Sequence, residues 1–404
     1  MLRNSLFLLI PALLAAQSGA KLLVISIDGL DARLLNDPSL KVKAPNLRKL
    51  MREGASATVI GVTPSETWPA HASLVTGVSP WQHGVLVNDV GAAALRAPAL
   101  WDVAAQKGMR TAAVYWPGAL GAQVTFNLPQ LQETVRGSSA AFDSIAQKST
   151  PAGLAGLIEK RYSTFAKELW TDASSAQAVI YLLTVEKPDL LFVHLSELDA
   201  EEHETGARSI YAREVLENSD DLVGQMVAKA PAGTVIAVVS DHGFENANRT
   251  VRPRVMLKQA GVSGRVEVAD GLIGTADPGA AAALRKLLRE GKKWGLGREV
   301  PVAEVRAKAP SHAKWVAAFD TLPDFVANDE ERGPAVGRGP HTGTHAMWPN
   351  RADFRTILIV KGAGVKPRKL GEIDLMQVAP TLADVVGLKL PAAKSASLWR
   401  QITQ

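Results

Sequence analysis

The 404-residue chain contains no cysteine. This absence excludes disulfide bonds, thiolate metal ligands and a cysteine nucleophile. A catalytic metal ion would therefore be held by histidine, aspartate and glutamate. Histidine itself is scarce, with eight residues in the chain, so the places where histidines gather carry information.

The chain also lacks a strong charge of either sign. Its 45 basic and 40 acidic residues give a net charge of +5, which is a mild surface bias and no sign of a nucleic-acid-binding module. With 47% apolar and 21% charged residues, the composition excludes a disordered, collagen-like or coiled-coil chain. The length favours a large domain with an insertion, or two domains.

The N-terminus has the features of a signal peptide. Arg3 supplies a positive start, an apolar run follows from Leu6 to Ala16, and Ser18 and Ala20 suit a cleavage site. The run is shorter than the ~20 apolar residues that span a bilayer. We therefore expect residues 1–20 to be removed and the mature chain to be periplasmic or secreted, without a transmembrane helix. A retained, uncleaved anchor is the alternative.

From residue 21 onward, short apolar runs alternate with helix-like segments. The runs are typical of strands buried on both faces and cover residues 22–27, 110–115, 190–195, 234–239 and 356–360. The helix-like segments cover residues 44–53, 97–107, 173–183 and 209–228. This alternation predicts one α/β domain over residues 21–404, with a mostly parallel central sheet.

Residues from about 251 to 338 break the alternation. A helix is predicted to open with Asp277 as its N-cap and Pro278 in its first position, and to run to residue 289. We interpret this span as a small inserted α+β subdomain. The basic pair Lys292 and Lys293 that follows is typical of a solvated face, and a substrate-side patch is the alternative.

Aspartates follow three of the apolar runs. Asp28 follows the run at 22–27, Asp199 follows the run at 190–195, and Asp241 with His242 follows the run at 234–239. In an open α/β sheet, ligands collect outside the carboxyl ends of the strands, so these side chains are expected to converge on one crevice. One such aspartate is often a helix cap or a turn residue. Three of them, two with histidines alongside, favour a metal site.

Two pairs show helical i, i+4 spacing, which places both side chains on one face. They are Asp199 with His203, and His341 with His345. Oxygen and imidazole donors without thiolates suit zinc, with manganese as the alternative. The remaining histidines lie outside these pairs, and we expect structural roles for three of them: His71, His83 and His194.

A candidate nucleophile is Thr67, in the segment from Thr63 to Gly77 that is predicted to open a helix with Pro69 in its first turn. At that place free backbone N–H groups and the helix dipole favour an anion. The alternative is that Thr67 is only the N-cap, which is a common use of threonine. The local sequence favours neither interpretation.

Taken in chain order, the motifs resemble the alkaline phosphatase superfamily, specifically its nucleotide pyrophosphatase/phosphodiesterase branch. The matching motifs extend over nearly the whole mature chain: Ser26–Gly29, Ala44–Leu47, Glu66–His71, Leu74–Gly77, His83–Asn88, Trp116–Gly118, Asp199–His203, Ser240–Gly243, Gly343–His345 and Ala379–Leu382. The resemblance implies a three-layer α/β sandwich that hydrolyses small-molecule phosphodiesters or nucleotides with two divalent metal ions.

The resemblance also implies a role for individual residues. One ion would be held by Asp199, His203 and His345. The other would be held by Asp28, Asp241 and His242, and would contact Thr67. Thr67 would attack phosphorus to give a phosphothreonine intermediate, and Asn88 would donate a hydrogen bond to a phosphoryl oxygen.

Three positions depart from the pattern of many relatives: Glu66, Ala70 and Ala346. Glu66 beside the nucleophile should disfavour doubly charged monoesters, so a phosphodiesterase is expected, with a phosphomonoesterase or phosphonate hydrolase as the alternative. A sulfatase is disfavoured because the Cys/Ser-x-Pro-x-Arg motif is absent, and a catalytically silent module because the ligand set is complete. Trp68 would stack on a nucleobase or belong to the core.

Overall fold

The computed structural model describes residues 21–131, 139–339, 343–352 and 354–404. The predicted signal peptide at residues 1–20 and His341 lie outside the described residues. Within the described part of the chain, no helix combines the length and the apolarity needed to cross a membrane.

An eight-stranded sheet forms the centre of the molecule, in the order β17-β2-β16-β6-β1-β5-β3-β4. Its strands are β1 (Leu22–Ile27), β2 (Ala55–Ile60), β3 (Thr111–Val114), β4 (Phe126–Leu128), β5 (Leu190–Leu195), β6 (Val235–Val239), β16 (Thr356–Lys361) and β17 (Arg368–Asp374). All neighbours pair in parallel except β16, which runs antiparallel to both β6 and β2. The predicted α/β fold with a mostly parallel sheet is therefore confirmed.

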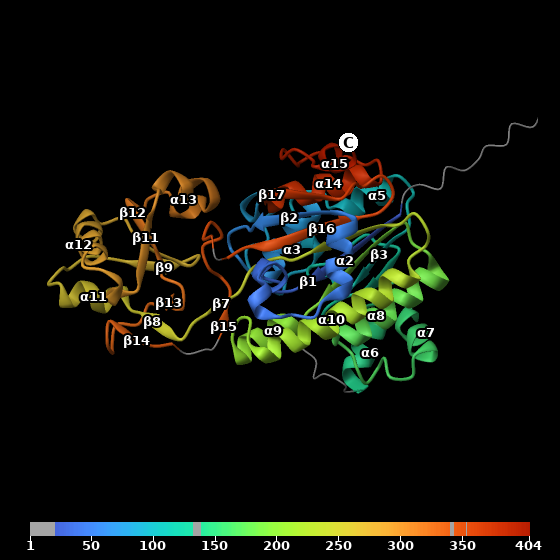
Figure 1. Ribbon diagram of the computed structural model, residues 1–404, viewed down its shortest axis with the longest axis horizontal. Helices are drawn as coiled ribbons and strands as arrows, with labels where there is room; N and C mark the ends of the chain where they lie inside the picture. The colour runs from blue at the N-terminus through green and yellow to red at the C-terminus, as the bar shows by residue number, and fades with distance from the viewer. Residues whose placement is uncertain (1–20, 132–138, 340–342, 353) are drawn as a thin grey trace, which may run out of the picture.

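Helices cover both faces of this sheet (Figure 1). One layer contains α2 (Pro45–Glu53), α6 (Ser139–Lys148), α7 (Leu154–Arg161), α8 (Asp172–Tyr181), α9 (Glu197–Thr205) and α10 (Ile210–Lys229). The other contains α3 (Thr67–Thr76), α5 (Leu100–Gln106), α14 (Val378–Val385) and α15 (Trp399–Thr403). The short helices α1 (Ala32–Asn36) and α4 (Pro80–His83) lie in connections.

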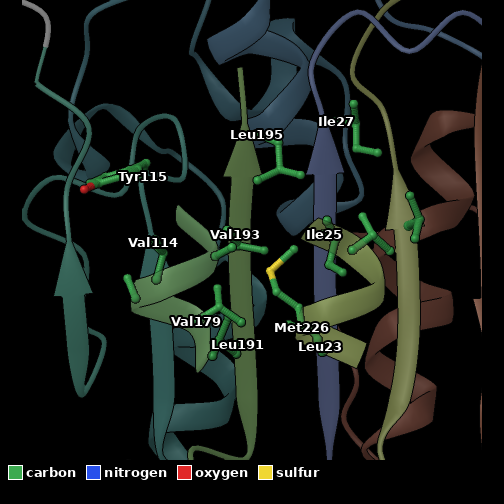
Figure 2. Packing of buried hydrophobic residues seen from close by; sticks show 14 of the residues in the cluster. Leu23, Ile25, Ile27, Val114, Tyr115, Val179, Leu191, Val193, Leu195 and Met226 are labelled. Carbon is green, nitrogen blue, oxygen red and sulfur yellow. The ribbon is translucent and has the colours of Figure 1, made fainter. Parts of the chain in front are cut away.

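The alternation of side chains along β1 shows why the sequence there reads as one apolar run. Leu23, Ile25 and Ile27 face the first layer, where Figure 2 shows Met226 of α10 beside them. Leu22 and Val24 face the second layer. Because helices bury both faces of the strand, no polar residue is needed on either one.

Residues 249–338 form a lobe apart from the large sheet (Figure 1). It holds a four-stranded sheet, β11-β12-β10-β9, and a three-stranded sheet, β13-β8-β14. Its elements are β8 (Arg249–Val251), α11 (Pro253–Gln259), β9 (Glu267–Ala269), β10 (Leu272–Thr275), α12 (Pro278–Arg289), β11 (Leu296–Val300), α13 (Val302–Lys308), β12 (Ala317–Thr321), β13 (Phe325–Ala327) and β14 (Val336–Arg338). The lobe begins and ends side by side, because β8 pairs with β14. The Asp277 side chain caps α12 by accepting from the N–H groups of Gly279 and Ala280.

A small two-stranded sheet lies between this lobe and the main sheet, at the edge where β6 ends. It pairs β7 (Glu245–Asn246) with β15 (Gly343–Thr344) in antiparallel register. Since β7 follows the end of β6 and β15 precedes His345, this pairing brings two distant parts of the chain to the same edge.

Candidate metal centre and active site

Three neighbouring strands deliver the acidic residues to one edge. The order β6-β1-β5 is parallel throughout, so the carboxyl ends of these strands coincide. The Nε2 atom of His242 lies 3.3 Å from Oδ1 of Asp28 and 3.2 Å from Oδ2 of Asp241. The side chains that follow these strand ends therefore lie close together, as expected.

One group of potential ligands consists of Asp199, His203 and His345, whose ligand atoms lie within 4.8 Å of one another. Oδ1 of Asp199 is 3.7 Å from Nε2 of His203 and 3.8 Å from Nε2 of His345. The Nδ1 atom of His203 lies 3.3 Å from the Gly343 carbonyl, and that of His345 lies 3.2 Å from the Ser65 carbonyl. Because a carbonyl only accepts, each Nδ1 carries the proton and each Nε2 presents a lone pair to the cluster.

A second group contains Asp28, Asp199 and His242, again within 4.8 Å. The sequence predicted Asp241 in this place. Asp241 lies directly beside the group, with its Oδ2 next to His242, while its Oδ1 accepts the N–H of Gly29 at 3.2 Å. Asp199 thus belongs to both groups.

The chemistry of these atoms fits divalent cations. Among the described residues, several site atoms are buried without a hydrogen-bond partner: Oδ1 of Asp28, Oδ1 of Asp199, Oδ2 of Asp241 and both ring nitrogens of His242. Burial and the neighbouring carboxylates raise the pKa of Asp28, and the same causes raise the pKa of Asp199 to about 8. Burial lowers the pKa of His242 to about 3. Crowded carboxylates beside neutral imidazoles match the donors that zinc and manganese take, and a cation would supply the missing partners.

Thr67 is the first residue of α3, and Glu66 is the N-cap, without a side-chain capping hydrogen bond. The alternative in which Thr67 serves as the N-cap is therefore wrong. The cap contact comes from Asn88, whose Oδ1 accepts the N–H of Trp68 at 3.0 Å. This contact fixes the Asn88 amide and leaves its Nδ2 as a donor at the helix terminus. Thr67 is 7% exposed.

Short contacts connect the segment around Thr67 with the two groups of potential metal ligands. His71 donates from Nδ1 to the Thr67 carbonyl at 2.8 Å, and the same nitrogen lies 3.5 Å from Oδ2 of Asp241. Ser65 accepts from the backbone N–H of Ala346 at 3.0 Å, next to His345. The threonine therefore lies between the loops that carry both groups.

Two histidines that were expected to be structural support site residues. His71 and His194 are both buried. His194 Nε2 lies 2.9 Å from Oδ2 of Asp28, and His71 Nε2 lies 2.8 Å from the Ser26 hydroxyl. Position along the chain gave no sign of these partners, because each contact joins segments far apart in sequence.

A pocket of about 390 Å³ has Trp68, the residue after Thr67, in its wall. Asp89, Leu120, Leu131 and Lys148 also line it. Trp68 is 6% exposed and packs against Ala72 and Val85. The interpretation of Trp68 as a core residue is supported by this packing, while stacking on a nucleobase stays a prediction for a side chain that also borders the pocket.

The inserted lobe reaches the same edge through the turn between β9 and β10. Gly271 in this turn approaches the backbone so closely that a Cβ there would lie 2.4 Å from the Trp348 nitrogen. Its neighbour Asp270 contacts Nε2 of His312 at 2.7 Å. Burial and the nearby Asp270 raise the pKa of Glu66. The lobe thus adds a second carboxylate near Glu66, the residue before Thr67.

A buried set of carboxylates and imidazoles next to a helix-terminal threonine is the arrangement of a metal-assisted hydrolase. Residues 22–321 match the family model for type I phosphodiesterase/nucleotide pyrophosphatase. The chain belongs to this family, as its motifs indicated.

The curated relatives include proteins that are named phosphodiesterases. The chain is 25% identical over 248 residues to venom phosphodiesterase 2 of Crotalus adamanteus, covering 55% of this chain and 27% of that protein. It is 24% identical over 249 residues to ectonucleotide pyrophosphatase/phosphodiesterase family member 3 of Rattus norvegicus, covering 56% of this chain and 25% of that protein. The match therefore spans about a quarter of the length of these curated relatives.

Solved structures share the fold. Human ectonucleotide pyrophosphatase/phosphodiesterase 5 superimposes with a TM-score of 0.64 at 16% identity, over 95% of this chain and 100% of that one. An inactive variant of the murine protein, in complex with AMP, has a TM-score of 0.62 at 17% identity, over 94% of this chain and 98% of that one. This likeness shows a common architecture.

Proposed function

We propose that the chain is a metal-dependent phosphodiesterase or nucleotide pyrophosphatase that uses Thr67 as its nucleophile. The observation that carries the proposal is the convergence of two ligand groups, which share Asp199, on the N-terminus of α3. Family membership supports the reaction class.

The two groups would hold two divalent cations, with zinc as the first choice and manganese as the alternative. Such cations lower the pKa of a bound hydroxyl and neutralise charge on a phosphoryl group. Asp199, His203 and His345 form one set, and Asp28, His242 and the adjoining Asp241 form the other.

The residues of the chain then perform a two-step displacement. The Thr67 hydroxyl gives its proton to water and attacks phosphorus in line. The bond from phosphorus to the first alcohol breaks as the phosphothreonine forms, and the leaving oxygen takes up a proton from water. A water molecule then attacks the same phosphorus and loses a proton, while the bond to the Thr67 oxygen breaks and that oxygen is protonated again. Asn88 donates from Nδ2 to a non-bridging oxygen, an interaction that counts most where charge develops in the transition state. His194 donates to Asp28 whenever that carboxyl is ionised, and so fixes its orientation.

The preferred substrate is a diester. Glu66 and Asp270 place negative charge near the nucleophile, and this charge disfavours the second negative charge of a monoester. The pocket beside Trp68 is large enough for a substituent of nucleoside size. The inactive murine neighbour in complex with AMP is consistent with a nucleotide as substrate. A signal peptide at residues 1–20 would place the enzyme in the periplasm or outside the cell.

The test compares bis-p-nitrophenyl phosphate with p-nitrophenyl phosphate at equal concentration. Enzyme stripped by a chelator should lose turnover and regain it with Zn²⁺ or Mn²⁺. Faster monoester turnover would favour the phosphomonoesterase alternative. No turnover of either ester by metal-replete protein would contradict the proposed function and favour a silent metal-binding module.

A further inference from the structure

A cluster of largely buried charged side chains adjoins the two groups of potential metal ligands and takes no part in the reaction described above. It contains Asp31, which is fully buried, together with Arg33, Arg208 and Glu245. The side chain of Arg208 is only 15% exposed. Removing charged groups from water is costly even when they are paired, so a buried ion-pair cluster is weak evidence for stability alone.

We propose that Arg208 is a positioning residue that holds together three segments of the chain that carry the proposed metal ligands. Its Nη1 donates to Oδ2 of Asp31 at 3.1 Å and to the Phe244 carbonyl at 3.0 Å. Its Nη2 donates to Oε1 of Glu245 at 3.1 Å, and its backbone N–H donates to Oε1 of Glu202 at 2.9 Å.

Every acceptor belongs to a segment that also carries a proposed ligand. Asp31 lies three residues after Asp28, and Phe244 lies two residues after His242. Glu202 immediately precedes His203 on α9. One arginine therefore connects the ends of β1 and β6 with α9, although these segments are far apart in the sequence.

The backbone of Arg208 agrees with this role. Its φ of 62° lies in the left-handed region, where non-glycine residues are uncommon and persist only when the surroundings impose the conformation. The side-chain and backbone contacts of Arg208 supply that constraint.

Arg33 does not duplicate the function. It donates to the Phe244 carbonyl at 3.1 Å and approaches Oε2 of Glu245 to 3.5 Å, but it starts from α1, next to Asp31. These contacts join the segments that follow β1 and β6. Lysine would not replace Arg208, because only the planar guanidinium presents several donors in a fixed fork.

The inference rests on the proposed metal centre, and the experiment separates the two. Arg208→Lys is compared with Arg252→Lys in the inserted lobe. Arg252 is a matched control because its side chain is 13% exposed and also pairs with a carboxylate, that of Glu330. Glu245→Gln is a second variant that weakens the same cluster and keeps the size of the side chain.

Zinc affinity is measured by competition with a chromogenic chelator, beside the melting temperature of the metal-free protein and kcat. We expect Arg208→Lys to bind Zn²⁺ about 10–100-fold more weakly, as changes to residues that orient ligands do. Its kcat should fall and should recover in part at high Zn²⁺, while its metal-free melting temperature stays near that of Arg252→Lys. Glu245→Gln should shift zinc affinity in the same direction.

Zinc affinity and kcat equal to those of wild type in Arg208→Lys or in Glu245→Gln would overturn the inference and leave the proposed function intact. An Arg208→Lys protein that melts far below the control and fails to recover with Zn²⁺ would show a purely structural role, which also overturns it. A wild-type protein that binds neither Zn²⁺ nor Mn²⁺ would overturn the proposed function and the inference together.

Discussion

Replacing Thr67 by alanine separates the chemical role of this residue from its structural one. Thr67 occupies the first position of α3, and the capping contact to Trp68 comes from Asn88. Alanine at position 67 therefore removes no cap. The stability cost is the loss of one buried methyl group, about 0.8 kcal/mol, partly offset by the better helix propensity of alanine.

The expected effect on the reaction is far larger. Without a nucleophile, turnover of bis-p-nitrophenyl phosphate should fall by about 10³–10⁴-fold, which corresponds to about 4–5.5 kcal/mol in the barrier. Thr67→Ser should keep partial activity because a hydroxyl remains. Acid-quenched wild-type enzyme should carry phosphoryl label on Thr67 whenever hydrolysis of the intermediate is the slower step.

Thr76→Ala is the matched control in the same helix. Thr76 is fully buried and its hydroxyl donates to the Ala72 carbonyl at 2.7 Å, so this variant should lose stability and keep turnover per folded molecule. Metal content and the melting temperature are measured for all variants. A folded, metal-replete Thr67→Ala enzyme with most of its activity would refute the reasoning, and water would then have to attack phosphorus directly.

Three further outcomes are expected. The wild-type protein should hold two divalent metal ions by elemental analysis, and His203→Ala should lose one of them with nearly all activity; an active protein with one ion or none would contradict this. Glu66→Gln should lower the ratio of diester to monoester turnover about 5-fold, since removing a like charge near the surface is worth about 1 kcal/mol, and an unchanged ratio would speak against charge selection. Burial raises the pKa of Asp172 to about 6 from an ordinary 3.8, so the folded state binds the proton more tightly and the contribution of Asp172 to stability falls as pH rises from 3.8 to 6. The free energy of unfolding of Asp172→Asn, measured in the presence of chelator, should therefore gain up to about 3 kcal/mol relative to wild type above pH 6. The same difference between the two proteins at pH 4 and at pH 7 would contradict this.

Local sequence was sufficient for the fold class and for five of the eight strands of the central sheet, while β2, β4 and β17 were not predicted. Strands buried on both faces must be apolar along their whole length, and so β1, β5 and β6 were evident at 22–27, 190–195 and 234–239 almost to the residue. Asp28, Asp199 and Asp241 follow these strands, and parallel pairing places strand ends together. The amino-acid order by itself therefore points to the candidate ligands.

The finer arrangement of the site depended on contacts between distant segments. Whether Thr67 caps its helix was undecided locally, because the capping group belongs to Asn88, 21 residues further along the chain. The membership of Asp199 in both ligand groups depends on how α9 packs against the ends of β1 and β6.

The same holds for the residues that support the site. His194 contacts Asp28 across 166 positions and Arg208 contacts Asp31 across 177, while Asp270 approaches Glu66 from the inserted lobe. Hydrophobic periodicity reports which face of an element is buried, because burial acts on each residue through its own solvation. It carries no information on which buried polar group meets which, since that pairing exists only after the sheet, the helices and the lobe have packed together.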